Sequence, residues 1–181
     1  YVDDNGKEYA LVGLENAVSI VDVSNPTNPV EVQNIPGATT IWRDLKVWGK
    51  YAYVTLRTGN FCRQAVNQLE VVDIEDPTSP KQVAVYPMQN PHGLSVTGNN
   101  LFLCEGDFGL KSFNISDKSK IGNNLLQHLK SIKSYDVIAG QKSLIVTGDD
   151  GVYQFNYQNT SKLNQLSKIK IQNPLNSSFL R

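Results

Sequence analysis

Short runs in which apolar and polar positions alternate recur along the chain. They are rich in β-branched and aromatic residues, a composition typical of strands. Between residues 42 and 90 four such runs follow one another: Asp44–Trp48, Tyr51–Leu56, Leu69–Ile74 and Gln82–Tyr86. Gly49 and Lys50 predict a tight turn after the first run, and two prolines predict a loop before the last. No stretch predicts a helix, so the pattern indicates an all-β protein.

One of these runs returns at nearly regular distances. Val18–Val23 is repeated at 69–74, 110–115 and 152–157. Its polar marker is Asp22, then Asp73, Asn114 and Asn156, and these are separated by 51, 41 and 42 residues. A second run, Asp44–Gly49, returns in the same phase as Gly93–Gly98 and Asp136–Gly140. A period of about 40–50 residues is typical of propellers and related arrays.

Each repeat predicts a four-stranded sheet, or blade, with apolar positions on both faces. Such a sheet cannot bury itself, whereas sheets stacked around an axis bury one another. We therefore predict a β-propeller over residues 1–171, in units of about 1–41, 42–90, 91–133 and 134–171, with a C-terminal tail at 172–181. About four blades are visible, and the first lacks its inner strand. Closure into a larger propeller would need upstream sequence, which we favour, or a strand from the tail.

The segment Val21–Val30 resembles the LVIVD repeat and its Ser-Asx-Pro-x-x-Pro turn. Tyr51–Gly59 and Asn90–Leu94 are similar to LVIVD lipoproteins, while Glu8–Gly13 and Trp42–Val47 look more like a sister group of anchored propellers. The resemblance covers residues 1 to about 171. It implies a secreted bacterial protein of Bacteroidetes type, at the extracellular or outer-membrane surface, with a lipid anchor upstream. It is specific for fold and weak for activity.

The last two units depart from this pattern. They carry Asn114 and Asn156 where the repeat has aspartate, and Lys118–Lys120 stands where prolines are expected. We therefore expect the turns of these two units, rather than their strands, to differ from the rest.

The balance of charge narrows the choice of partners. The chain has 17 basic and 17 acidic residues, so no net charge attracts nucleic acid. Its apolar runs are far shorter than the roughly 20 residues of a membrane helix. The motifs for nucleotide binding, a nucleophile elbow or a zinc-protease helix do not occur in the sequence. We predict no catalytic residue, no metal ion and no cofactor.

Loops that enter the inner strand and loops that join the second and third strands gather at one end of a propeller. That end is the default binding site. The predicted ligand-binding residues there are Trp42, Arg43, Asp44, Arg57, Arg63, His92, Glu105, Tyr135 and Asp136. Asn90, Asp107, Asp149 and Asp150 lie in the same loops.

Two chemical readings of these loops compete with structural ones. His92, Asp44 and Asp136 could hold a metal ion or act as acid and base. Alternatively, which we favour, the two carboxylates bond backbone N–H groups at strand starts and His92 completes a turn. Similarly, 105–109 and 148–151 could bind calcium, but Asp-Gly is also a preferred hairpin turn, and we favour the turn.

The two cysteines leave a further alternative open. If the chain is extracellular, as the resemblance implies, Cys62 and Cys104 could form a disulfide that pins the loop 57–68. Otherwise Cys104 is a small buried hydrophobe.

Three functions fit the sequence. The first, which we favour, is a non-catalytic binding or scaffolding module at the cell surface for a protein or glycan partner. The second is an extracellular hydrolase or lyase with a site around His92, Asp44 and Asp136. The third is a structural subunit of a cell-surface assembly.

Overall fold

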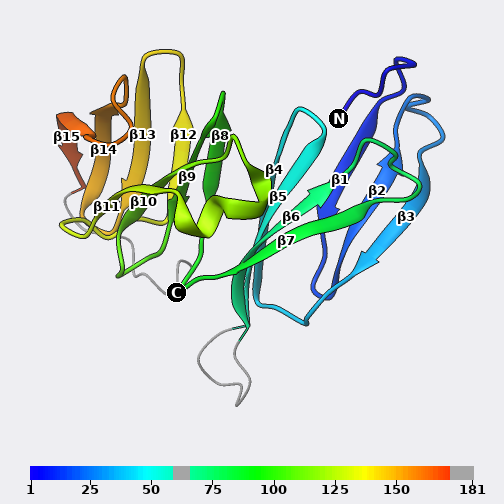
Figure 1. The fold of residues 1–181 in the computed structure, drawn as a ribbon, viewed down its shortest axis with the longest axis horizontal. Coiled ribbons are helices and arrows are strands. Elements are labelled where there is room, and N and C mark those ends of the chain that lie inside the picture. Colours follow the sequence, from blue (N-terminus) through cyan, green and yellow to red (C-terminus); the bar gives the residue numbers. More distant parts are fainter. Residues whose placement is uncertain (59–65, 172–181) are drawn as a thin grey trace. The chain divides into compact units, whose positions relative to one another are not determined.

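The computed structural model describes residues 1–58 and 66–171. This part of the chain forms fifteen strands in four antiparallel sheets and one short 3-10 helix. The chain divides into two compact units, Tyr1–Pro87 and Met88–Arg181, and each unit holds two of the sheets (Figure 1). The prediction of an all-β chain of propeller blades with an incomplete first blade is confirmed.

The first unit contains a three-stranded and a four-stranded sheet. The three-stranded sheet runs β1 (Tyr9–Gly13), β2 (Ala17–Asp22), β3 (Val30–Pro36). The four-stranded sheet runs β4 (Trp42–Trp48), β5 (Tyr51–Arg57), β6 (Asn67–Asp73), β7 (Lys81–Pro87). At the position of the missing inner strand, the backbone N–H of Tyr9 donates to the carbonyl of Tyr1 at 2.7 Å.

The second unit contains two four-stranded sheets. The first runs β8 (Leu94–Thr97), β9 (Asn100–Cys104), β10 (Leu110–Asn114), β11 (Leu125–Leu129). The second runs β12 (Asp136–Ala139), β13 (Ser143–Gly148), β14 (Gly151–Asn156), β15 (Asn164–Lys170). In all four sheets neighbours in sequence are neighbours in space, which is the meander expected of propeller blades.

The expectation that the chain has no helix is wrong at one place. The 3-10 helix η1 (Lys118–Asn123) joins β10 to β11 (Figure 1). From the marker residue to the outer strand the chain advances 8 residues in the other three sheets and 11 here. The prolines found in the first two units are missing at this point, and the extra residues coil into one turn capped by Asp117, whose side chain accepts from the N–H of Ser119.

The expected difference in turn geometry does not extend to the marker residue itself. In every sheet its Oδ1 accepts the backbone N–H two residues on: Asp22 at 2.9 Å, Asp73 at 2.9 Å, Asn114 at 2.9 Å and Asn156 at 2.8 Å. Three residues later a second Asx side chain repeats this bond: Asn25 at 3.1 Å, Asp76 at 3.0 Å, Asp117 at 3.0 Å and Asn159 at 3.0 Å. An Asx turn needs only a carbonyl-type acceptor, so asparagine replaces aspartate without changing the turn.

Each unit buries apolar residues between its two sheets. In the first unit Tyr9, Val18 and Ile20 pack with residues of β5 and with Val72 and Ile74. In the second unit Phe102, Cys104 and Leu110 of one sheet pack with Val137, Leu144, Val146, Tyr153 and Phe155 of the other. These two cores hold the loop ends described next.

Candidate functional site

The predicted site residues of the first unit lie at the end of the β4–β5–β6 ladder. Trp42 and Arg57 are cross-strand partners, and the N–H of Ile41 donates to the carbonyl of Arg57 at 3.0 Å. Trp42 is 37% exposed. Because side chains alternate along a strand, Trp42 and Asp44 share one face of the sheet, and Arg43 points to the other.

Arg43 is tied into the fold rather than displayed on the surface. Its guanidinium donates to the carbonyls of Leu14 at 2.6 Å, Ala17 at 2.7 Å and Ala38 at 2.8 Å. Burial lowers the pKa of the guanidinium, and the Glu70 carboxylate opposes part of that shift. Arg43 therefore joins β4 to the β1–β2 loop and to the segment that leads out of β3.

The two aspartates at the starts of inner strands make the same contact in both units. The N–H of Leu45 donates to Asp44 Oδ1 at 2.8 Å, and the N–H of Val137 donates to Asp136 Oδ1 at 2.8 Å. Asp44 also pairs with Lys46 at 3.3 Å. The backbone contact that we favoured for these carboxylates is present in each case.

His92 lies inside the second unit. It is 2% exposed, and its ring meets the ring of Tyr135 edge-on with centroids 5.2 Å apart. Its backbone N–H donates to the carbonyl of Cys104 at 2.8 Å. A Cβ on Gly106 would stand 3.2 Å from His92 Nε2, so the imidazole packs against bare backbone. His92 thus offers a ligand almost no surface.

Glu105 is the most deeply buried acid of the site. Its side chain has no exposed surface, accepts the N–H of Gln89 at 2.8 Å and forms an ion pair with Lys111 of β10. Lys111 is itself only 15% exposed. The pair ties the segment that enters the blade to a central strand. The sequence did not reveal this role, because neither the pairing of Glu105 nor its burial follows from the spacing of residues along the chain.

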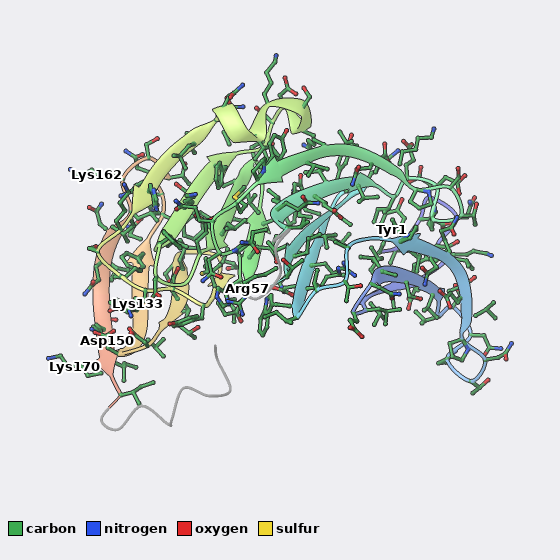
Figure 2. The ribbon with its side chains drawn as sticks, turned by 90° about the horizontal axis from the view of Figure 1, so that it is seen from below. Tyr1, Arg57, Lys133, Asp150, Lys162 and Lys170 are labelled. Carbon is green, nitrogen blue, oxygen red and sulfur yellow. The ribbon has the colours of Figure 1, made fainter. Side chains whose placement is uncertain are left out.

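The acidic hairpin loops of the second unit are paired with lysines. Lys133 reaches Asp107 at 2.8 Å and Asp149 at 3.4 Å, and Lys168 pairs with Asp150. Figure 2 labels Lys133 and Asp150 on the same side of this unit. In residues 1–58 and 66–171 no group of three or more His, Cys, Asp or Glu side chains could hold a metal ion. The pairing of these carboxylates with lysines agrees with our interpretation of the two loops as hairpin turns.

Two predicted residues lie outside the described part of the chain. Arg63 and Cys62 fall within 59–65, so the role of Arg63 and the disulfide with Cys104 stay predictions. Cys104 itself is buried in the core of the second unit. The ligand-binding role of the other predicted residues also stays a prediction.

The structure adds one exposed aromatic residue that the sequence reading passed over. Phe108 is 44% exposed in the β9–β10 hairpin. The sequence held a signal for this exposure, because Gly106 and Gly109 flank Asp107-Phe108. In the structure both glycines have positive φ, of 56° and 91°. Such a tight loop leaves its central side chains little core to enter.

Comparison with known proteins agrees with the repeated sheets described above. The LVIVD repeat family model matches residues 6–36 and 41–87, which contain the three strands β1–β3 and the whole of the second sheet. The first two sheets of the chain carry LVIVD repeats. No curated protein matches it.

Two solved structures similar to this chain, PpgL and Nup159, are propeller proteins. A functionally unknown protein from Desulfotomaculum acetoxidans has a TM-score of 0.70 at 10% identity, covering 92% of this chain and 53% of that one. The Pseudomonas aeruginosa periplasmic gluconolactonase PpgL has a TM-score of 0.70 at 14% identity, with coverage of 96% and 54%. The N-terminal domain of Nup159 has a TM-score of 0.57 at 14% identity, with coverage of 93% and 43%.

At these identities the likeness concerns the fold alone. The chain spans about half the length of these two solved structures, the Desulfotomaculum acetoxidans protein and PpgL. Within the described ranges, no helix is long and apolar enough to cross a membrane.

Proposed function

We propose that this protein is a non-catalytic binding or scaffolding module that uses the loop ends of its blades. The observation that carries the proposal is the contrast between the groups at these ends. The carboxylates of Asp44 and Asp136 accept backbone N–H groups, Glu105 is paired with Lys111, and His92 is buried. Groups engaged in this way hold the loops in place and are poorly placed for acid–base work.

The exposed side chains at the same ends suit binding. Trp42 is 37% exposed beside its cross-strand partner Arg57, and Ile41 next to it is 65% exposed. Tryptophan and arginine are common anchors of protein interfaces, and tryptophan also offers an apolar face to a sugar ring. The partner in this proposal is a protein or a glycan.

The location belongs to the proposal as well. The LVIVD repeats support a secreted protein of bacterial type, held at the extracellular or outer-membrane surface by a lipid anchor. Growth with a labelled fatty acid, followed by fractionation of the producing cells, tests the anchor. Label in the mature protein is expected, and unlabelled protein confined to the cytoplasm contradicts this placement.

The two alternative functions have less support. A hydrolase or lyase centred on His92 would need the imidazole to reach solvent, whereas its ring lies against Tyr135 and Gly106. The name gluconolactonase describes PpgL, whose likeness to this chain is one of fold. A structural subunit would show itself by stable partners that co-purify.

Binding to a glycan array and to a panel of extracellular proteins tests the proposal. Trp42→Ala is expected to lower the affinity for any ligand found in these screens by about tenfold or more, since anchor residues contribute about 2 kcal/mol. Trp48→Ala is the matched control, because Trp48 is 44% exposed at the opposite end of the same strand.

Two results would contradict the proposal. One is an equal loss of affinity for Trp42→Ala and Trp48→Ala, which would show that the loop end is not the binding surface. The other is turnover of a bound polymer that His92→Ala abolishes while the circular dichroism spectrum is kept, which would favour the enzyme.

A further inference from the structure

Each of the four sheets contains a shift in strand register, and the shift lies at the same place in every sheet. In residues 1–58 and 66–171 the pairings among the earlier strands of each sheet are continuous. The pairing of the last, outer strand is interrupted between the residues two and one positions before the marker residue: Ile20 and Val21, Val71 and Val72, Ser112 and Phe113, Gln154 and Phe155. The shift is therefore part of the repeat.

The shift comes from one extra residue in the outer strand. In β7, Ala84 pairs with Val71 and Gln82 pairs with Val72, so Val83 between them has no residue of β6 opposite it. The same count leaves one apolar residue without an opposite residue in each of the other outer strands: Val32 in β3, Leu126 in β11 and Leu166 in β15. Such a β-bulge bends its strand and increases the local twist. We call these four residues the bulge residues.

Without a bulge, β7 would be a good template for a further strand. Its sheet has the four strands of a blade, and β7 is the last of them, so its far edge carries backbone N–H and C=O groups. The strand is seven residues long, against about 5–6 for a typical strand. Its side chains include Val83 and Val85, each 40% exposed. A long apolar strand at a sheet edge is a predicted site of pairing with another chain.

Prolines add a second obstacle to strand pairing in the first unit. Pro36 ends β3, and Pro87 ends β7. Proline has no backbone N–H to donate to a ladder and is confined in sheets to edge strands, strand starts and bulges. The outer strands of the second unit, β11 and β15, contain no proline. Of the two features, the bulge is therefore the one that all four outer strands share.

We propose that the bulge in each outer strand keeps that edge from pairing with a strand of another molecule, above all with the outer strand of a second copy. In β7 the bulge divides the edge into two short stretches, Lys81–Gln82 and Ala84–Pro87, that do not form one continuous ladder. Strand addition at the edge is thereby prevented, and other parts of the sheets, such as their loop ends, remain for binding. The proposal does not depend on which ligand binds at the loop ends.

Deletion of Val83 tests the proposal on the full 181-residue chain. The deletion removes the bulge and leaves the other pairs of β6 and β7 in register, because the pairs of Gln82 and Ala84 become consecutive. The straightened strand is expected to pair with the same strand of a second copy. Light scattering coupled to size exclusion should show a mass that rises with concentration to about twice that of the parent chain or more, a rise that the parent does not show.

Val83→Ala is the matched control, because it keeps the number of residues, and with it the bulge, and removes only the two methyl groups. It is expected to behave as the parent chain does. Hydrogen exchange identifies the contact, since strand pairing should protect the β7 amides of the deletion variant as it associates. Deletion of Leu126, in an outer strand without proline, is a second variant. It is expected to associate in the same way, with the gain in protection at β11.

Three results would overturn the proposal. The first is a deletion variant that keeps the circular dichroism spectrum and has the mass of the parent chain at every concentration. The second is association without added protection of the outer-strand amides, or association of Val83→Ala to the same extent, because side chains rather than a straightened backbone would then make the contact. The third is loss of the fold in both deletion variants, which would show that the bulge serves the sheet itself rather than its edge.

Discussion

Lys111 and Glu105 form an ion pair in which the carboxylate has no exposed surface and the ammonium-bearing side chain is 15% exposed. The two partners are therefore unequal. Without Lys111, the Glu105 carboxylate would remain buried beside the N–H of Gln89. Without the Glu105 charge, Lys111 can still turn toward water. An uncompensated buried charge is among the most destabilising changes in a protein.

We therefore expect Lys111→Met to lower the free energy of unfolding by about 3 kcal/mol and Glu105→Gln by about 1–2 kcal/mol. Glutamine keeps an acceptor for the N–H of Gln89. Urea denaturation of both variants and of the double variant measures the coupling. Equal losses for the two single variants would contradict the inequality.

The Arg43 guanidinium predicts a second stability effect. It donates to three carbonyls on two segments, and a lysine ammonium cannot span the same geometry. Arg43→Lys is expected to lower the free energy of unfolding by about 2 kcal/mol, since partly buried carbonyls lose their donors. Lys46→Met, at an exposed pair on the same strand, is the control and should change it by less than about 0.5 kcal/mol. A similar result for both would remove the proposed role of Arg43.

Asp117 predicts a dependence of stability on acid. Hydrogen bonds from the Ser119 side chain, and then from Lys120, lower the pKa of its carboxyl to about 2, from 3.8. A lowered folded-state pKa stabilises the fold above the unfolded value and loses that effect as the pH falls through the folded value. The contribution should therefore disappear between about pH 4 and pH 2.

Asp117→Asn separates this titration from the turn. Asparagine keeps the Oδ1 acceptor, as Asn159 does at the same place in the last sheet. The variant should lose less stability than the parent protein when thermal midpoints are followed from pH 5 to pH 2. Parallel midpoint curves would show that Asp117 does not titrate in this range.

Gly93 predicts a steric effect at the start of the third blade. A Cβ there would lie 2.2 Å from Asp136 Oδ1 and 2.9 Å from Asp136 Cα. Backbone cannot yield cheaply, so Gly93→Ala is expected to lower the thermal midpoint by several degrees. Gly98→Ala is the control, because its Cβ meets no atom within 4 Å and only its φ of 55° opposes alanine. A larger loss at Gly98 would contradict the close packing at Gly93.

The strands were predictable because their signal is local. Period-2 alternation placed all four strands of the second blade within about two residues of their observed bounds, and the Asx marker located the turn after each third strand. The same alternation places the Arg43 side chain on the opposite face from Trp42 and Asp44, so its inward direction could have been predicted from the sequence.

Other features depend on neighbours that are distant in sequence. The burial of His92 follows from Gly106 and Tyr135, and that of Glu105 from packing around Lys111. Neither partner is at a spacing that a strand pattern identifies. The 3-10 helix was missed because its one-turn signal consists of a cap and a few extra residues rather than a period.

The paired Asx bonds of each blade are local. Both acceptors and both N–H donors come from the same short segment, and the links to the preceding blade, from Gln33 to the carbonyl of Thr78 and from Ser112 to the carbonyl of Thr160, use other atoms of the turn. A stretch of about 40 residues can therefore be duplicated, deleted or exchanged as a cassette without redesigning the turn. Duplication of a blade in the gene would leave these Asx bonds intact. Longer or shorter arrays could therefore be engineered by joining the chain between such cassettes.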